Sequence, residues 1–348
     1  MTIAAIIPSF RVRDHILGTI KAIGPEVSLI YVVDDKCPED TGKFVEANCT
    51  DPRVRVLYHD QNKGVGGAMI SGYRRAVQDG ADILVKIDGD GQMDPRLIPY
   101  FCGPIQKELA DYTKGNRFFA GKALKSMPGI RLFGNAVLSF MTKASSGYWN
   151  MLDPTNGYTA LSGKVASVID FDKVSNRYFF ESDMLFQLGK LRARVVDIPL
   201  MALYGDEESN LKVGKVLPEF LLKNLRNALK RLVYSYFVRG FSLASISLVA
   251  SIMLLLVGAI AAIFVGITAN VSGVPASTGT IVSIALLLIF GFQLLMTFLS
   301  YDISSTPDMA IHPLLANFPG APLEQAYPAE DMSETASPRA QSSRNTGK

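Results

Sequence analysis

Three carboxylates and a proline follow one short apolar run. The stretch ILVKIDGDGQMDP, residues 83–95, predicts a buried strand that ends in a loop carrying Asp88, Asp90 and Asp94. Carboxylates so close repel one another unless a cation or several hydrogen-bond donors compensate, and hard divalent cations prefer oxygen ligands. Asp88 and Asp90 are therefore candidates for holding a cation. Asp94 precedes Pro95 and is more typical of a helix N-cap.

A second apolar run, LIYVVDD, also ends in paired acids, Asp34 and Asp35. Parallel strands share one carboxyl edge, where open α/β sheets place their ligands. Both acid pairs are therefore expected on one rim, where a single cleft could hold a sugar nucleotide. A carboxylate there can accept from a base N–H or a ribose hydroxyl, and a simple turn remains the alternative reading of Asp35.

The elements that must position these acids alternate along the first two thirds of the chain. Short apolar runs near residues 3–8, 28–34, 54–58 and 82–88 are separated by helical patterns. This order predicts an α/β fold with a mainly parallel sheet and helices on both faces. The apolar N-terminal run is too short for a signal sequence, and the three cysteines show no C-x-x-C spacing, so free thiols are expected.

A basic amphipathic helix is predicted next, at about residues 216–237. Its apolar row comprises Leu221, Leu225, Leu229, Leu232 and Tyr236, and its basic residues Lys223, Arg226, Lys230 and Arg231 lie largely elsewhere. Residues 210–240 hold seven Lys or Arg against one Glu. Such a helix directly before an apolar segment fits the membrane interface, where it would meet anionic headgroups. An ordinary core helix with a solvated face is the alternative.

Residues 241–301 contain no Asp, Glu, Lys or Arg. Two apolar runs, at about 241–266 and 280–301, each reach the roughly 20 residues that cross a bilayer, which predicts a transmembrane hairpin. Basic residues precede the first run and are missing from the connection, so the catalytic region and both termini are expected in the cytoplasm, at the cell membrane. The expected parts are a catalytic domain (1–210), an interfacial helix (211–240), the hairpin (241–301) and a disordered cytoplasmic tail (302–348).

Seven short motifs carry a family resemblance across roughly residues 3–300. They are IIPSF, VVDD, NKGVGGA, DGDGQMDP, GNRF, the stretch from Arg131 to Asn135, and DPTNGYTAL. In this order they resemble the family 2 glycosyltransferases of GT-A fold. With the appended hairpin, the chain most resembles the polyprenyl-phosphate glycosyltransferases, the group of dolichyl-phosphate mannose synthases and undecaprenyl-phosphate glucosyltransferases.

The resemblance implies a role for each motif. Nucleotide binding is implied for Pro8, Ser9, Asp34, Asp35, Asn62, Gly64 and Asp88, and binding of Mg²⁺ or Mn²⁺ for Asp88, Asp90 and Gln92. The implied catalytic residues are Asp88 and Asp90 with Arg117 and Arg131, the two arginines holding the acceptor phosphate. A weaker implication, contact with the sugar or the acceptor, falls on Asn135, Asp153, Asn156, Glu181 and Asp183. The glycine-rich NKGVGGAMISGY is no P-loop and is expected to form a tight helix start near the nucleotide.

These features predict an inverting, metal-dependent transferase that moves one hexose from a UDP- or GDP-sugar to polyprenyl phosphate at the cytoplasmic membrane face. A lipid phosphate is already largely ionised near neutral pH, so no strong protein base is required, and His59 has no evident partner. No Q-x-x-R-W stretch follows the acid loop, which favours single transfer. The alternatives are extension of a lipid-diphosphate-linked saccharide or other glycan, and a non-catalytic membrane scaffold. No nucleic-acid partner is expected, and homo-oligomerisation is left open.

Overall fold

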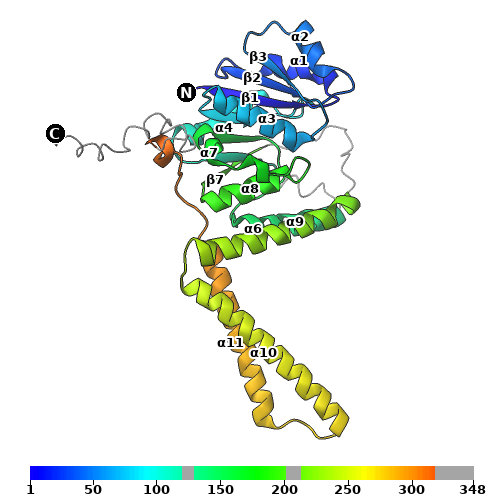
Figure 1. Ribbon diagram of the computed structural model, residues 1–348, viewed down its shortest axis with the longest axis vertical. Coiled ribbons are helices and arrows are strands. Elements are labelled where there is room, and N and C mark those ends of the chain that lie inside the picture. Colours follow the sequence, from blue (N-terminus) through cyan, green and yellow to red (C-terminus); the bar gives the residue numbers. More distant parts are fainter. Residues whose placement is uncertain (120–128, 201–212, 318–348) are drawn as a thin grey trace, which may run out of the picture.

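A seven-stranded sheet forms the centre of the catalytic domain in a computed structural model of the chain, which describes residues 1–119, 129–200 and 213–317 (Figure 1). The strands are β1 (Ile3–Ser9), β2 (Leu29–Asp34), β3 (Val54–Tyr58), β4 (Ile83–Lys86), β5 (Tyr112–Asn116), β6 (Thr159–Ser162) and β7 (Val195–Pro199). Their spatial order is β3-β2-β1-β4-β6-β5-β7. All neighbours pair in parallel except β6, which runs antiparallel to both β4 and β5. The expected mainly parallel α/β sheet is confirmed.

Helices cover both faces of this sheet, because its strands alternate their apolar side chains. On β1, Ala4 and Ile6 pack on one face, while Ile3, Ala5 and Ile7 pack on the other. The first face is covered by α3 (Val65–Gln78), α7 (Gly163–Val168) and α8 (Phe180–Leu191). The second is covered by α1 (Arg13–Ala22), α2 (Thr41–Asn48) and α4 (Ile98–Gln106). Apolar burial on both faces is what a largely parallel sheet requires.

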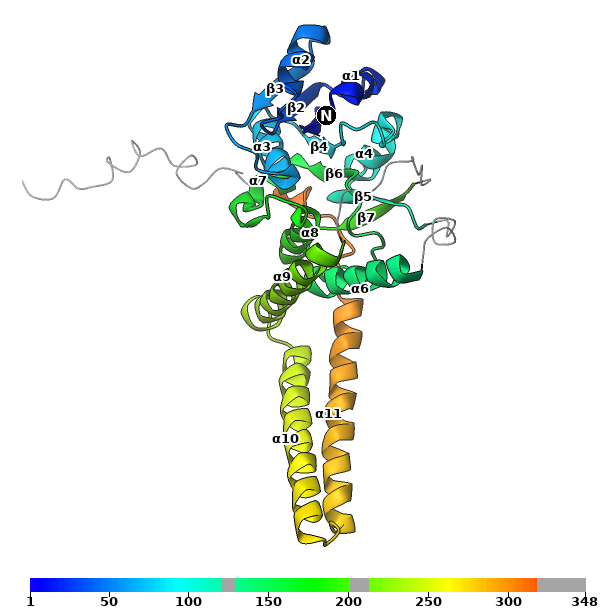
Figure 2. The ribbon, with the colours of Figure 1, turned by 90° about the vertical axis from the view of Figure 1, so that its right-hand side faces the viewer.

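Two further helices form a layer beneath the domain and connect it to a long hairpin (Figures 1 and 2). They are α6 (Gly129–Ser146) and α9 (Val213–Val233), which pack against each other and against α8. A π-helical turn, Tyr234–Val238, then leads into α10 (Leu243–Ser272), which packs along α11 (Thr278–Ser304). At 1.5 Å per residue the 30 residues of α10 span about 45 Å, more than the ~30 Å apolar core of a bilayer. Both helices are long and apolar enough to cross a membrane.

Helix α9 differs from the expected amphipathic pattern in which side it buries. The side chains turned into the protein are one aromatic and three polar ones, Phe220, Asn224, Asn227 and Arg231. The exposed row is apolar and comprises Leu222, Leu225, Leu229 and Val233. The polar residues are buried because each has a partner: Asn224 bonds Ser145, Asn227 bonds Asp183, and Arg231 pairs with Asp302. Arg231, which was expected away from the apolar row, therefore belongs to the inner side of α9, whereas Leu225 and Leu229 of the expected apolar row are exposed.

The segment after the hairpin is ordered up to residue 317, unlike the disordered tail expected from residue 302. It returns to the catalytic domain, where Ile311 and Leu315 pack against the core. The buried carboxylate of Asp111 accepts the backbone N–H of Ile311 at 2.8 Å and that of His312 at 2.7 Å. The His312 ring lies 2.8 Å from the same carboxylate. Disorder was expected from residue 302 because the sequence near this segment does not reveal its partner. That partner is Asp111, 201 residues from His312, whose carboxylate accepts the backbone N–H groups of the segment. Residues 318–348 lie outside the described part of the chain.

Candidate active site

The carboxyl ends of three adjacent strands converge where the strand order reverses. β1 lies between β2 and β4. The chain passes from β1 to β2 and β3 on one side, and β4 then adds to the sheet on the other side of β1. Such a reversal opens a crevice at the carboxyl edge of a sheet, where α/β proteins bind ligands. Ser9 ends β1 beside Asp34 of β2, as expected. The Ser9 hydroxyl is buried without a hydrogen-bond partner among the described residues, which is unusual for a hydroxyl that no ligand engages.

The Asp-Gly-Asp loop begins two residues after β4 and folds back on itself. The backbone N–H of Gln92 donates to Asp90 Oδ1 at 3.0 Å, and Gly91 has a left-handed φ of 80°, so a glycine is required at the turn. The backbone N–H of Asp88 donates to Met93 Sδ at 3.3 Å. Asp94 accepts from the N–H of Arg96 and caps the short helix Pro95–Leu97, as its sequence predicts. The loop therefore leaves Asp88, Asp90 and Gln92 at the sheet edge.

A buried lysine that the sequence reading did not include lies directly under this loop. Lys86 Nζ is 3.0 Å from Asp88 Oδ1 and 3.4 Å from Glu181 Oε1, and the residue is 2% exposed. Burial alone lowers the pKa of Lys86, but the two carboxylates outweigh it and raise that pKa above its usual value. Burial raises the pKa of Glu181 despite the pull of the lysine. Lys86 is thus the shared partner of both carboxylates, and Asp88 is the closer of the two.

A glycine gives this lysine its space. A Cβ atom placed on Gly157 would lie 2.5 Å from Lys86 Nζ and 3.2 Å from Asp88 Oδ2. The turn of DPTNGYTAL therefore passes against the acid loop, and any larger side chain there would displace the buried ammonium. Neither Lys86 nor Gly157 was singled out from the sequence, although the glycine within the NGY turn was a visible signal.

The acid pair that follows β2 is engaged by the protein itself. Asp34 accepts the backbone N–H of Cys37 at 2.7 Å and that of Gly42 at 2.6 Å, so it fixes the start of α2. Asp35 accepts the N–H of Lys63 at 2.8 Å and that of Gly64 at 2.7 Å. Both carboxylates are buried. They stand on the predicted rim, and in this structure they organise its loops.

His59 has partners, contrary to the sequence reading. Its Nδ1 lies 2.7 Å from Asp35 Oδ1 and its Nε2 lies 2.8 Å from Ser71 Oγ. The imidazole is thus held between β3 and α3 and orients Asp35. The His59 ring therefore has a structural role at the rim, where it links Asp35 to Ser71.

The glycine-rich stretch forms a close-packed helix start, as expected. Asn62 Nδ2 donates to the carbonyl oxygen of Asp35 at 3.1 Å, and Gly64 precedes α3 with a left-handed φ of 86°. The backbone N–H of Gly67 donates to the carbonyl of Asn176 at 2.8 Å. A Cβ on Gly64 would lie 2.8 Å from that carbonyl oxygen. The glycines therefore let the start of α3 approach the loop before α8.

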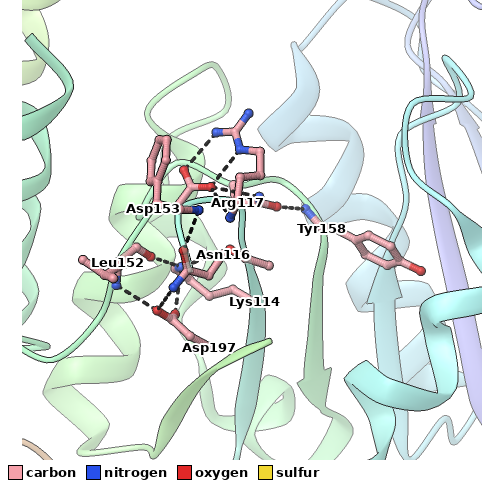
Figure 3. A network of polar contacts seen from close by, with 10 residues as sticks. Lys114, Asn116, Arg117, Leu152, Asp153, Tyr158 and Asp197 are labelled. Carbon is pink, nitrogen blue, oxygen red and sulfur yellow. Dashed lines mark hydrogen bonds and ion pairs between the residues drawn. The ribbon is translucent and has the colours of Figure 1, made fainter. Parts of the chain in front are cut away.

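Two predicted site residues, Arg117 and Asp153, bind each other (Figure 3). Arg117 Nε donates to Asp153 Oδ2 at 2.8 Å and its Nη2 donates to Oδ1 at 2.9 Å, a bidentate pair. Burial tends to raise the pKa of Asp153, but the guanidinium outweighs it and holds that pKa below its usual value. Asn156 also donates to Asp153, at 3.1 Å. The half-exposed arginine is thus fixed in orientation just beyond β5.

A second pair supports this loop from below. Lys114 Nζ lies 2.9 Å from Asp197 Oδ1, and Asp197 also accepts from Asn116 Nδ2 and from the backbone N–H of Leu152 (Figure 3). Lys114 in turn donates to the carbonyl of Leu152. Burial lowers the pKa of Lys114. The sequence reading missed both Lys114 and Asp197, because their roles depend on β5 and β7 being neighbours.

The remaining predicted residues are Asp183, Arg131, Asn135 and Pro8. Asp183 accepts from Ser175 at 2.9 Å and from Asn227 at 2.7 Å, so it ties the loop before α8 to α9 and is separated in role from Glu181. Arg131 and Asn135 lie on α6, but their side chains are outside the described part of the structure. Pro8 lies on β1 beside Val33 of β2.

The residues at the acid loop suit a hard divalent cation in their chemistry. Asp88, Asp90 and Gln92 supply carboxylate and amide oxygens, which Mg²⁺ and Mn²⁺ prefer. Among the described residues no group of three or more His, Cys, Asp or Glu side chains is arranged as a closed metal site. Cations that bind nucleotide phosphates take only one or two protein carboxylates and complete their shell with phosphate and water oxygens. The acid loop is of that open kind.

The fold, with an acid-lined edge at the strand reversal, is that of an α/β ligand-binding domain, and comparison with known proteins identifies it as a glycosyltransferase. Residues 4–169 match the model of "Glycosyl transferase family 2". The chain is 31% identical to undecaprenyl-phosphate mannosyltransferase of Micrococcus luteus, over 65% of this chain and 93% of that one. It is 30% identical to UDP-N-acetylglucosamine–dolichyl-phosphate N-acetylglucosaminyltransferase of Methanococcus voltae, over 58% and 85%. The chain belongs to glycosyl transferase family 2.

Solved structures of similar fold include glucosyl-3-phosphoglycerate synthase of Mycobacterium tuberculosis. That crystal structure is 18% identical to this chain, with a TM-score of 0.48, and the match covers 66% of this chain and 79% of the other.

Proposed function

We propose that the chain catalyses inverting, metal-dependent transfer of a single hexose from a UDP- or GDP-sugar to polyprenyl phosphate at the cytoplasmic face of the membrane. The observation that carries this proposal is the exposed leucine row of α9, which lies beneath the catalytic domain and is joined to an apolar hairpin by the π-helical turn. A domain held at the membrane surface by this helix can bind a soluble sugar donor and still reach the phosphate of an acceptor whose tail stays in lipid. Two relatives named for undecaprenyl and dolichyl phosphate acceptors support it.

The proposed chemistry needs little from the protein beyond positioning and charge. An acceptor phosphate oxygen attacks the anomeric carbon as the nucleoside diphosphate leaves from the opposite side, and one displacement of this kind inverts the anomeric configuration. The acceptor is already largely ionised at neutral pH, with a second pKa of about 6. Glu181 is paired with Lys86 and needs no role as a base. Arg117, held by Asp153, would present its outer N–H groups to the acceptor phosphate.

A divalent cation held by Asp88, Asp90 and Gln92 would offset the negative charge of the leaving diphosphate. Lys86 keeps Asp88 in place from inside the sheet. Asp34 and Asp35 shape the loops that would enclose the base and ribose. The donor half of the site is thus assigned to the edge formed by β1, β2 and β4, and the acceptor half to the loops after β5 and before β6.

The proposed topology places residues 1–240 and the C-terminal segment in the cytoplasm and the connection between α10 and α11 outside it. Basic residues of α9 next to the first span favour this direction. A single cysteine in place of Ser272, in a variant lacking the three native cysteines, should react with an impermeant thiol reagent added from outside the cytoplasm. Reaction only from the cytoplasmic side would reverse the orientation.

The function is tested by incubating membranes that contain the full chain with labelled UDP- and GDP-sugars and with polyprenyl phosphate. Transfer of one sugar per lipid, with an inverted anomeric configuration, is the expected result. Asp90→Asn should lose transfer and keep its place in the membrane. Full cellular function of Asp90→Asn would instead favour a scaffold, and addition of sugar only to a lipid-diphosphate saccharide would favour the extension reaction.

A further inference from the structure

A cavity lies where the catalytic domain meets the hairpin, far from the acid loop. Its volume is about 230 Å³, well above the ~10–15 Å³ that admits one water. It is lined by the C-terminal ends of α6, α8 and α11, the π-helical turn and the start of α10. Glu181, which contacts the site lysine, lies at the opposite end of α8. The 18 residues of α6 span about 27 Å, so this cavity lies far from the start of α6, which carries Arg131.

Three arginines line this cavity, and only one of them has a carboxylate partner among the described residues. Arg231 is buried and forms a bidentate pair with Asp302, with distances of 2.7 and 2.8 Å. Arg192 and Arg239 are exposed at the rim. Asp302, the one acid of the lining, also accepts from Tyr236 at 2.6 Å, so its oxygens are occupied. The lining therefore carries an excess of two positive charges.

Within the described parts of the chain, the two rim arginines donate hydrogen bonds only to backbone carbonyls. Arg192 Nη2 donates to the carbonyl of Ser305 at 3.1 Å, and Arg239 Nη1 donates to that of Lys190 at 2.7 Å. These bonds cap the last turns of α11 and α8, where cations are favourable. A guanidinium has five N–H donors, and each capping bond uses one of them. The bond to the backbone carbonyl also fixes the orientation of the remaining donors. Capping thus fixes the arginines without neutralising them.

The π-helical turn is the second feature of this cavity. The backbone N–H of Arg239 donates to the carbonyl of Tyr234 at 2.8 Å, a five-residue spacing that inserts one residue into the helical path. Such turns are rare and recur at functional sites. Here the turn separates α9 from α10 and places Ser235 and Arg239 on the cavity wall. Gly147 completes the wall, since a Cβ there would lie 3.2 Å from Arg231 Nη1.

We propose that this cavity binds the phosphate of an anionic phospholipid headgroup, with Arg192 and Arg239 as its ligands. The inference rests on the membrane placement proposed above, which sets the cavity at the depth where α10 enters and α11 leaves the bilayer. Basic pockets beside the cytoplasmic ends of membrane helices suit anionic headgroups. Planar guanidinium forks bind phosphate in a bidentate manner. A bound lipid would join the catalytic domain to the hairpin.

The test uses the full chain in phosphatidylcholine bilayers that contain a minor fraction of phosphatidylglycerol. After extraction into detergent, mass spectrometry measures phosphatidylglycerol retained per protein. Arg192→Gln/Arg239→Gln should retain about 25-fold less, about 5-fold for each arginine. The matched control is Arg226→Gln/Lys230→Gln, which removes the same charge from the exposed side of α9 and should retain the lipid. Arg192→Lys/Arg239→Lys should fall between, because it keeps charge and loses the fork.

A second measurement, with inorganic phosphate added to the detergent-solubilised protein, distinguishes a lipid phosphate from a free phosphate as the ligand of the cavity. Thermal stabilisation by phosphate in the wild type, lost in the double glutamine variant, together with lipid retention supports the proposal. Stabilisation by phosphate without lipid retention would assign the cavity to a soluble phosphate and overturn the lipid. Equal lipid loss in the control variant would reduce the effect to general surface charge and also overturn it. The measurement uses no sugar donor, so an inactive transferase that retains lipid contradicts only the proposed function.

Discussion

The ammonium of Lys86 lies 3.0 Å from Oδ1 of Asp88, so the first acid of the Asp-Gly-Asp loop is held from inside the sheet. Lys86 ends β4 and is 2% exposed, and its only other carboxylate neighbour recorded in the described residues is Glu181. One cation against two carboxylates leaves the cluster short of positive charge. A buried deficit of this kind favours a cationic ligand at the adjacent loop.

Lys86→Met should destabilise the catalytic domain by about 3–5 kcal/mol, because it leaves a buried carboxylate without compensation. Thermal unfolding of the detergent-solubilised protein measures the loss. Lys86→Met/Glu181→Gln should recover part of it, since the amide is neutral. Equal stability of the single and double variants would show that Glu181 does not contribute to the cluster.

The bidentate pair of Arg117 and Asp153 predicts a defined dependence on pH. The pKa of Asp153 is held low in the folded state, so its stabilising contribution is complete above its unfolded value of about 3.9 and is lost as pH falls through the lower folded value. Arg117→Ala removes the strongest of the influences that lower this pKa, so the pKa of Asp153 rises. The melting temperature of this variant should therefore lie furthest below the wild type near neutral pH and approach it in acid. A difference that stays constant from pH 7 to well below the unfolded value of about 3.9 would contradict the pairing.

The leucine row of α9 can be tested without disturbing the core. Leu225 is 51% exposed, so Leu225→Glu should leave the melting temperature nearly unchanged and weaken transfer to long-chain polyprenyl phosphate, because a carboxylate opposes insertion among anionic headgroups. Leu109→Glu is a matched control, since Leu109 is also 51% exposed but lies between α4 and β5. Initial rates on vesicles compare the two. Equal transfer rates for Leu225→Glu and Leu109→Glu would show that α9 does not contact the membrane surface.

The segment after α11 depends on one buried carboxylate. Asp111→Ala removes the acceptor of the backbone N–H groups of Arg194, Ile311 and His312, and should cost on the order of 3 kcal/mol, at about 1 kcal/mol or more for each buried group. Limited proteolysis should then cut near residues 306–317. Asp172→Ala is the control, because its pair with Arg74 is exposed and contributes about 0–1 kcal/mol. An uncut segment in Asp111→Ala would show that apolar packing alone holds it.

Local pattern was sufficient to predict the first four strands and the edge that carries the acids. The apolar runs that end in Asp34 and at Lys86 became β2 and β4 on either side of β1, because strand identity and parallel order follow from short-range periodicity. The same holds for the two apolar helices. These features require no knowledge of distant partners.

The misses share a physical cause. Arg231 was placed off the apolar row of a basic amphipathic helix, yet it is buried, because Asp302 pairs with it from 71 residues away. Asp111 holds His312 across 201 residues in the same way. Lys86 was passed over because a lysine inside an apolar run has meaning only when Asp88 and Glu181 are seen around it. Polar burial depends on partners that long-range folding supplies, which periodicity does not record.

Substitutions in the donor half and in the acceptor half of the proposed site should have different effects. Asp90→Ala should lower transfer by on the order of 10²- to 10³-fold, because the leaving diphosphate loses its charge compensation, and excess Mn²⁺ should restore little. Asp94→Ala is the control within the same loop, since Asp94 only caps the helix Pro95–Leu97 and should keep metal-dependent nucleotide binding. Arg117→Ala should bind UDP or GDP normally and require more polyprenyl phosphate, with partial rescue by Arg117→Lys because the fork is lost.

Calorimetry of UDP and GDP binding, with and without Mn²⁺, separates these effects from the dependence of rate on acceptor concentration. If Asp90→Ala binds nucleotide with an unchanged response to the metal, the acid loop does not hold the cation. If Arg117→Ala loses nucleotide binding while its acceptor dependence is normal, the arginine belongs to the donor side. The expected pattern, metal response lost in one variant and acceptor affinity in the other, requires that the edge formed by β1 and β4 and the loop after β5 serve different substrates.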